Sequence, residues 1–178
     1  MVTAAVEGRL ELLARALESV RRQTLRPVDH LVALDYARRG TGATLAKLAR
    51  AVDTEWIATL DDDDELLPHH LETLHAHREG ADVVYPYCRV VGRRPLHYVN
   101  RPFDPELLRR RNFIPATALI RTATLRAAGG WPDHRLQDYR LWLRLLDHGA
   151  RFQHVPEVTW IYHHHGANKS KGFTFPVD

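Results

Sequence analysis

The chain has 178 residues, a length that predicts one folded domain with one hydrophobic core. Hydrophobic residues make up 44% and charged residues 26%, which excludes disordered and collagen-like proteins. No apolar run reaches the ~20 residues that cross a bilayer, and no secretory leader opens the chain, so we expect neither a membrane protein nor an exported one. Cys88 is the one cysteine. It cannot form an intramolecular disulfide, which fits a cytoplasmic protein.

The net charge is +3, and arginine supplies most of the basic residues. Because the guanidinium fork matches phosphate oxygens, these arginines could bind either nucleic acid or a nucleoside diphosphate. Residues 109–111 form the only arginine triple, and no recognisable nucleic-acid module surrounds them. A solvated helix face is the simpler interpretation of the triple, and a nucleic-acid-binding module stays as an alternative.

Strands and helices alternate along the first ninety residues. Hydrophobic patterns predict strands at 2–6, 30–35, 55–60 and 81–91, with helices at 9–22, at 43–52 and from Pro68 onward. This alternation is typical of an α/β fold. We therefore expect a single compact domain with a mostly parallel sheet flanked by helices.

The second half is less regular. Asp104 and Pro105 are typical of a helix start, and Gly149 is typical of the end of an amphipathic helix at 138–148. We also expect a strand at 116–121, a short helix at 122–128, two short strands at 151–155 and 158–162, and a C-terminal tail.

Four adjacent aspartates, Asp61–Asp64, follow the predicted strand at 55–60. Such carboxylates repel one another, so gathering them favours the presence of a cation. At the carboxyl end of a buried strand they would face the crevice where open α/β sheets bind ligands. Carboxylate oxygens suit Mg²⁺ or Mn²⁺, which are often shared with substrate phosphates. A solvated acidic turn is the alternative interpretation.

The acidic segment resembles the DxD segment of the GT-A-fold glycosyltransferases, in particular the inverting family 2. Further stretches resemble that family in the same order: Leu12–Val20 with Gln23 and Thr24, Gly129–Trp131 with Gln137–Leu145, and Tyr162–His165 with Asn168 and Ser170. The resemblance spans about residues 2 to 170. It implies a Rossmann-like GT-A fold and a metal-dependent, inverting transfer of a sugar from a nucleotide-diphosphate donor to an acceptor hydroxyl.

The resemblance also implies residue roles. Asp35 matches the acidic position on the donor's base or ribose, Asp61 lies nearer the ribose, and Asp62 belongs to the same donor-binding set. Asp63 matches the ligand of Mn²⁺ or Mg²⁺, and His165 matches a late histidine near the metal or diphosphate. Asp138 matches the general base. A UDP-sugar is the family's default donor, and the acceptor stays open.

Three positions depart from the family pattern. Ala4-Ala5 stands where the family has Pro-Thr, and Leu45 stands in an element that usually supplies an arginine. Diphosphate contacts would then come from Arg38, Arg39 or Lys47. Gln137 replaces the first acid of the family's Glu-Asp pair. These departures keep a non-catalytic nucleotide-sugar-binding protein as an alternative.

The organisation expected from the resemblance is a nucleotide-sugar-binding half at 1–91, an acceptor and catalytic half at 92–165, and a tail at 166–178. Trp131 and Gln137 are the candidates for acceptor contact, because an indole ring can stack on a sugar. Asp138 could instead be only a helix cap. The histidines at 69–70 and 163–165 could bind zinc in a hydrolytic site, although no characteristic spacing supports that.

Overall fold

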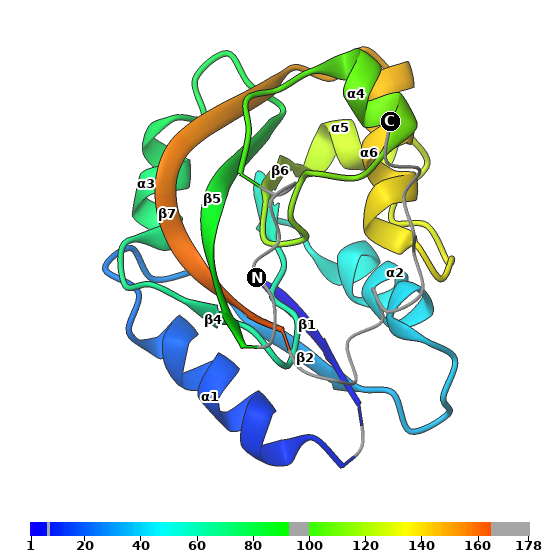
Figure 1. The fold of residues 1–178 in the computed structure, drawn as a ribbon. Coiled ribbons are helices and arrows are strands. Elements are labelled where there is room, and N and C mark those ends of the chain that lie inside the picture. Colours follow the sequence, from blue (N-terminus) through cyan, green and yellow to red (C-terminus); the bar gives the residue numbers. More distant parts are fainter. Residues whose placement is uncertain (7, 93–99, 165–178) are drawn as a thin grey trace.

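The computed structural model describes residues 1–6, 8–92 and 100–164 (Figure 1). Its strands are β1 (Val2–Ala5), β2 (Leu31–Leu34), β3 (Trp56–Ala58), β4 (Glu65–Leu66), β5 (Val83–Gly92), β6 (Leu119–Arg121) and β7 (Phe152–His164). Its helices are α1 (Leu10–Arg21), α2 (Thr41–Ala51), α3 (His70–Ala76), α4 (Pro105–Arg110), α5 (Thr122–Ala127) and α6 (Gln137–Asp147). None of these helices has the length and apolar character needed to span a membrane. The α/β class is confirmed.

The strands form one sheet in two parts. β1 and β2 pair in parallel, and the larger part has the order β3-β6-β5-β7-β4. A parallel bridge between Val2 and Thr59 joins the two parts, with the Leu60 amide donating to the Val2 carbonyl at 3.2 Å. The residues that follow β3 therefore run alongside β1 in the same direction, starting at the amino end of β1.

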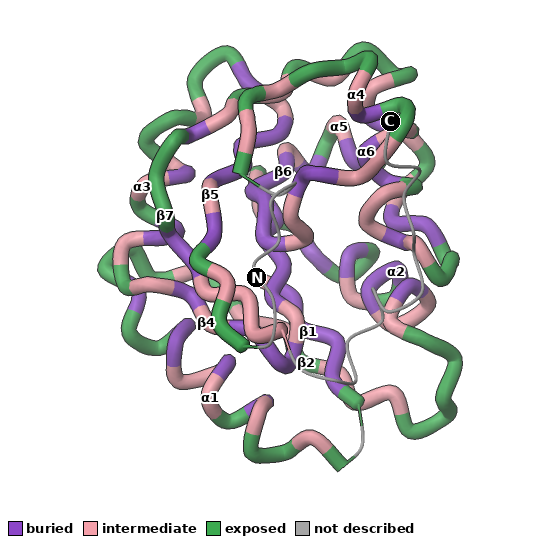
Figure 2. Tube along the Cα trace, viewed as in Figure 1, coloured by how far each residue is buried: buried purple, intermediate pink, exposed green. Residues whose placement is uncertain are grey.

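Alternate residues of the strands bury against helices on opposite faces. Val83 and Tyr85 pack with the core under α2, α4, α5 and α6, whereas Val84 packs with the core under α3. A third cluster joins α1 to β4, β5 and β7. Figure 2 shows buried residues running through the central strands and exposed ones in the outer loops. This side-to-side alternation is what the period of a strand dictates.

The sheet is mostly parallel, as expected, because β1, β2, β3, β5 and β7 run in one direction, whereas β6 and β4 run in the opposite one. β6 runs antiparallel to both β3 and β5, and β4 runs antiparallel to β7. Only β1–β2 and β5–β7 are parallel among the named strand pairs of the described residues. Alternating elements predict parallel strands only where the connection is a crossover. Here the connection from β5 to β6 runs through the short helix α4 and places β6 between β3 and β5.

The C-terminal strands also differ from the expectation. Residues 152–164 form one strand, β7, rather than two, because the pairing with β5 continues past an irregularity. Pro86 faces Val155 and Tyr87 faces Val158, so Pro156 and Glu157 are left out of the register. Such a bulge lets a strand bend without ending. The two-residue strand β4, which pairs with β7, had no signal in the hydrophobic pattern.

His70 ties α3 to β7 from inside the core. It is fully buried, and its Nδ1 lies 2.8 Å from the Thr159 hydroxyl. Burial lowers its pKa from 6.5 to about 3, so the folded protein keeps it neutral. The unfolded chain binds the extra proton first, so this contribution to stability is complete above about pH 6.5 and is lost as the pH falls toward 3.

We therefore expect H70Q to reduce the acid-induced loss of stability. The wild type should lose about 2 kcal/mol through His70 between pH 7 and pH 5, and the variant should not. Urea denaturation at both pH values measures this difference. H148Q, at an exposed site, is the control and should keep the wild-type pH dependence. An unchanged dependence in H70Q would contradict the assignment.

Candidate functional site

The acidic segment lies directly after β3 and is largely buried. Asp62, Asp63 and Asp64 are 4%, 8% and 2% exposed, and Asp61 is half-buried. One carboxylate oxygen each from Asp61, Asp63 and Asp64 lies within 4.8 Å of the others. Buried carboxylates at this density need compensating charge or hydrogen bonds, because burial disfavours their ionised form.

Part of that compensation comes from the chain around α1. Arg9 Nη1 lies 3.3 Å from Asp62 Oδ1 and 3.0 Å from Asp63 Oδ2. The Val6 amide donates to Asp62 Oδ2 at 2.8 Å, and Arg15 Nη2 donates to the Asp63 main-chain carbonyl at 2.8 Å. Neither arginine was among the residues singled out from the sequence. The hydrophobic periodicity of the helix predicts only an ordinary exposed position for Arg9 and Arg15.

Burial raises the pKa of two of these acids. For Asp62 the Val6 amide and Arg9 oppose that rise. For Asp64 burial raises the pKa well above its usual range, and the neighbouring Asp61 and Asp63 add to the rise. An arrangement that makes carboxylates costly to ionise in this way favours a cation beside them.

β7 reaches the same segment through His163. Its amide donates to Asp64 Oδ1 at 3.0 Å, and its Nε2 lies 3.6 Å from Glu65 Oε2. Burial lowers the pKa of His163, so the ring is mainly neutral at neutral pH and the second contact is not a full ion pair. The expected metal contact, His165, lies outside the described residues.

Zinc hydrolysis gains no support from the part of the chain that the structure describes. The one group of metal-ligating side chains found there consists of carboxylates, Asp61, Asp63 and Asp64. His70 is buried in the core with its ring against Thr159. Oxygen-only ligands suit Mg²⁺ or Mn²⁺ better than zinc.

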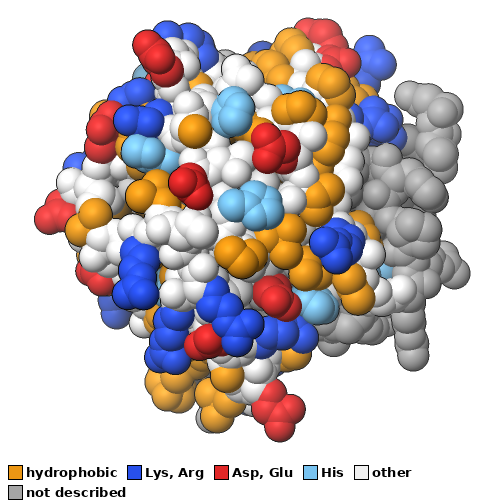
Figure 3. Space-filling model, turned by 90° about the vertical axis from the view of Figure 1, so that its left-hand side faces the viewer, with side chains coloured by type: hydrophobic (Ala, Val, Ile, Leu, Met, Phe, Trp, Pro, Cys, Tyr) orange, Lys and Arg blue, Asp and Glu red, His pale blue; other side chains and the backbone are white. Residues whose placement is uncertain are grey.

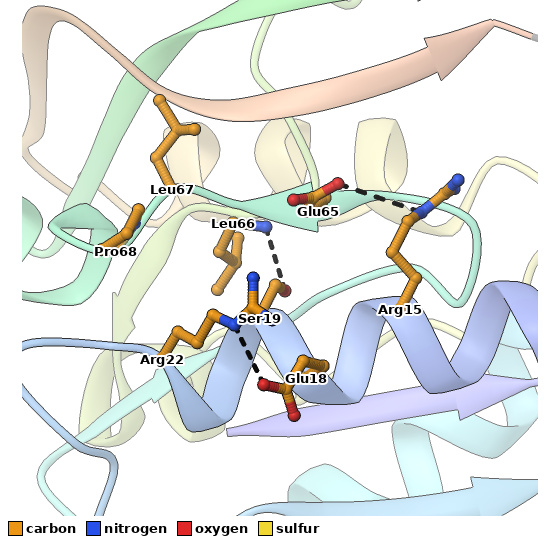
Figure 4. Close-up of a pocket in the computed structure, with 8 residues that line it drawn as sticks. All are labelled: Arg15, Glu18, Ser19, Arg22, Glu65, Leu66, Leu67 and Pro68. Atoms are coloured by element: carbon orange, nitrogen blue, oxygen red, sulfur yellow. Dashed lines mark hydrogen bonds and ion pairs between the residues drawn. The ribbon is translucent and has the colours of Figure 1, made fainter.

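α1 holds the segment that follows the acids (Figure 4). The Leu66 amide donates to Ser19 Oγ at 3.1 Å, and both residues line a small pocket of about 180 Å³ between α1 and β4. Gln23 Nε2 donates to the carbonyls of Ser19 and Leu67 at 3.1 and 2.8 Å, and its Oε1 accepts from the Leu71 amide at 2.9 Å. These contacts give a physical role to Ser19 and Gln23, which belong to the first stretch that resembles the family.

Gln23 is 3% exposed, so removing its amide leaves buried backbone groups without partners. We expect Q23A to lower the free energy of unfolding by about 3 kcal/mol, because unpaired buried groups cost about 1–3 kcal/mol each. Chemical denaturation measures the loss. Q153A is the control, since Gln153 is exposed and should stay within about 0.5 kcal/mol of wild type. Equal stability of the two variants would contradict the role.

Asp35, the expected nucleoside-binding residue, organises the loop between β2 and α2. Its amide donates to the Ala5 carbonyl at 2.9 Å, which places it beside the end of β1. Its carboxylate accepts from the amides of Arg39 and Gly40 at 2.9 and 2.6 Å. The side chains of Arg38 and Arg39 are exposed. The donor contacts expected of Asp35, Arg38 and Arg39 stay predictions.

Asp138 lies in the first turn of α6, where the N-cap residue is Leu136 and has no side-chain cap. Asp138 is therefore not the N-cap residue itself. Its Oδ2 accepts from Asn112 Nδ2 at 3.0 Å, so a residue before β6 orients the carboxylate. A role as general base stays a prediction.

α2 packs closely against the loop that leads to α6. A Cβ added at Gly42 would lie 2.7–2.9 Å from backbone atoms of Pro132 and His134, so only glycine allows this approach. The contact places the start of α2, which follows the Asp35 loop, beside the segment that leads to Asp138. Two regions far apart in the sequence are thus brought together.

The two expected acceptor residues are buried and bonded to each other. Trp131 and Gln137 are 5% and 7% exposed, and the indole N–H donates to Gln137 Oε1 at 2.5 Å. Their mutual hydrogen bond supports the start of α6, and their burial leaves little of either side chain exposed for contact with a sugar. Their contact with an acceptor stays a prediction.

The departure at Leu45 has a structural consequence. Leu45 is 2% exposed in the main core, whereas Lys47 on the same helix is exposed. An arginine at residue 45 would have to be buried without a known partner. Any basic contact to a donor from α2 therefore cannot come from that position.

A larger cavity of about 310 Å³ lies away from the acids. Its lining includes Met1, Leu31 and Trp56, which stand at the amino ends of β1, β2 and β3. Ligands of open α/β sheets bind at the carboxyl ends of the strands. The acidic segment is therefore the better candidate for the functional site.

Several basic residues of the described chain are paired with acidic side chains. Arg109 pairs with Asp147 at 2.7 Å, and Arg21 and Arg22 both lie within 4.0 Å of Glu18. Figure 3 shows basic side chains gathered toward the α1 end of one face, with acidic ones among them. On this face the mixed charge differs from the continuous positive stripe that is typical of nucleic-acid-binding surfaces.

A comparison with protein families identifies the family of the chain. Residues 30–136 match the family described as glycosyl transferase family 2. The chain belongs to glycosyl transferase family 2. None of the curated proteins matches the chain in sequence at a significant level.

Solved structures of this fold are similar over most of the chain. Residues 1–349 of S. aureus TarS in complex with UDP-GlcNAc give a TM-score of 0.78 at 14% identity, covering 97% of this chain and 60% of that one. A longer S. aureus TarS gives 0.76 at 12% identity, covering 92% and 36%. The mannosyltransferase PcManGT from Pyrobaculum calidifontis, in complex with GDP-Man and Mn²⁺, gives 0.64 at 15% identity, covering 90% and 56%. This chain therefore spans 60% or less of these proteins, and the likeness confirms the GT-A fold.

Proposed function

We propose that this family 2 domain transfers a sugar from a nucleotide-diphosphate donor to an acceptor hydroxyl, with inversion. The observation that supports the proposal most is the group of carboxylates after β3, at the carboxyl side of the sheet in a family 2 fold. A UDP-sugar is the first donor to test, because TarS was solved with UDP-GlcNAc. GDP-mannose is the second, because PcManGT was solved with it.

The acidic group fits a divalent cation. Three carboxylates converge within 4.8 Å, and their hard oxygens suit Mn²⁺ or Mg²⁺. Asp63 and Asp64 would hold the ion, with Asp61 beside it and nearer the ribose, and the bound ion would neutralise charge on the departing nucleoside diphosphate. The complex of PcManGT with Mn²⁺ makes manganese the natural first choice.

The residues of this chain have distinct roles in the proposal. Asp35, which follows β2, and Asp61, which follows β3, would hold the nucleoside. Arg38 and Arg39 would contact the diphosphate. Asp138 would take the proton from the acceptor hydroxyl as that oxygen attacks the anomeric carbon. The bond from that carbon to the phosphate oxygen breaks in the same displacement. Residues 1–91 would thus supply most donor contacts and residues 92–165 the base and acceptor contacts.

Release of nucleoside diphosphate from a panel of nucleotide sugars tests the function. Wild-type protein should release UDP or GDP from at least one donor in the presence of Mn²⁺, and a chelator should stop the release. Donor binding without release under any acceptor would instead favour a non-catalytic nucleotide-sugar-binding protein, a possibility that the buried Leu45 keeps open. Neither binding nor release with any donor would overturn both.

A further inference from the structure

The acidic segment places many negative charges close together. Residues 61–65 are all acids, and three of the aspartates are buried. Without a cation, such a group would repel itself strongly. Two arginines, Arg9 before α1 and Arg15 within it, offset this repulsion in different ways.

The Arg15 side chain contacts the acidic segment mainly at a main-chain carbonyl group. Its Nη2 donates to the Asp63 carbonyl oxygen at 2.8 Å, while its Nε stands 4.0 Å from Glu65 Oε2. This contact leaves the Asp63 carboxylate out of the interaction. It can therefore persist whatever binds to that carboxylate.

Arg9 contacts the carboxylates themselves. Its Nη1 lies 3.0 Å from Asp63 Oδ2 and 3.3 Å from Asp62 Oδ1, and those side chains are only 11% and 6% exposed. A guanidinium held against a nearly buried carboxylate is a substantial counter-charge. It also lies beside a member of the carboxylate group that would bind a metal.

The position of Arg9 allows its side chain to move away. It is the N-cap residue of α1, without a side-chain cap bond, and it follows Gly8, whose φ is 89°. Its side chain is 25% exposed, so a rotation brings the charged group into water without disturbing the core. Long arginine side chains readily change conformation in this way when their stem is at the surface.

We infer that Arg9 is a displaceable counter-ion of the acidic segment, which neutralises Asp62 and Asp63 when no metal is bound and leaves Asp63 when a divalent cation binds. This inference rests on the metal site of the proposed function. A guanidinium and a divalent cation on one carboxylate repel each other, so the two occupy it in turn. Arg9 thus lowers the affinity of the site for free metal and stabilises the metal-free protein.

Titration with Mn²⁺ alone, followed by the electron paramagnetic resonance signal of the free ion, tests the exchange. R9Q should bind Mn²⁺ at least tenfold more tightly than wild type, whereas R9K should keep an affinity near that of wild type because it keeps the charge. R21Q is the matched control. It removes the same charge from the same helix at a side chain that is 77% exposed, and it should stay within twofold of wild type.

Thermal unfolding provides the second readout. Without metal, R9Q should melt about 5–10 °C below R21Q, and saturating Mn²⁺ should remove most of that difference. An affinity of R9Q equal to or weaker than that of wild type would overturn the inference, as would equal melting of R9Q and R21Q without metal. Absence of Mn²⁺ binding in all variants would instead overturn the proposed metal site. Release of nucleoside diphosphate by the wild type in the presence of Mn²⁺ distinguishes failure of the Arg9 inference from failure of the proposed function.

Discussion

Replacing Asp138 with asparagine is expected to lower sugar transfer by about 10²–10⁴-fold, the usual contribution of a general base. Asparagine keeps the size of the side chain, and its amide oxygen can still accept from Asn112 Nδ2, as the carboxylate does at 3.0 Å. It cannot accept a proton from an acceptor hydroxyl. Donor affinity should change less than twofold, because the donor contacts come from other segments.

The measurement is the rate of transfer beside the dissociation constant of the nucleoside diphosphate. D147N is the matched control. It changes the same residue type at the last position of α6, where the side chain pairs with Arg109, and it should retain wild-type transfer. A D138N variant with wild-type transfer would refute the role. A loss of stability with unchanged transfer would show that Asp138 serves only the helix terminus.

Replacing Asp63 with asparagine should reduce metal-dependent release of nucleoside diphosphate at least about 100-fold. Changes to residues that only support metal ligands already cost 10–100-fold, and Asp63 is proposed as a ligand itself. Its neighbours Asp61 and Asp64 stay in place, so the fold should persist. The buried position, 8% exposed, keeps water from replacing the lost oxygen easily.

Release of UDP or GDP against Mn²⁺ concentration measures this effect. The D63N curve should shift to higher Mn²⁺ or vanish, while D53N, an exposed aspartate before β3, should follow wild type. Wild-type release by D63N at low Mn²⁺ would show that the ion is held elsewhere.

The sequence was informative where a pattern repeats along the chain. Hydrophobic periodicity predicted α1 within a residue at each end, and alternation predicted the α/β class. The direction of β6 could not be predicted, because it depends on how the chain returns through α4 and on which strands β6 meets. Continuity of β7 likewise depends on its long partner β5.

The same division applies to the candidate site. The acidic segment was evident because four adjacent carboxylates are costly without a partner. Arg9 and Arg15 were not, because a charged residue on a helix usually faces water and only the packing of α1 on the segment gives them partners. Burial of Trp131 was also hidden, since its bond to Gln137 depends on the turn of the chain before α6.

Calorimetric titration of wild-type protein with UDP or GDP, with and without Mn²⁺, tests the central claim most directly. We expect a saturable binding curve for at least one of the two in the presence of Mn²⁺ and much weaker binding after chelation. A flat titration of well-folded protein with both nucleotides, whether Mn²⁺ is present or not, would contradict it.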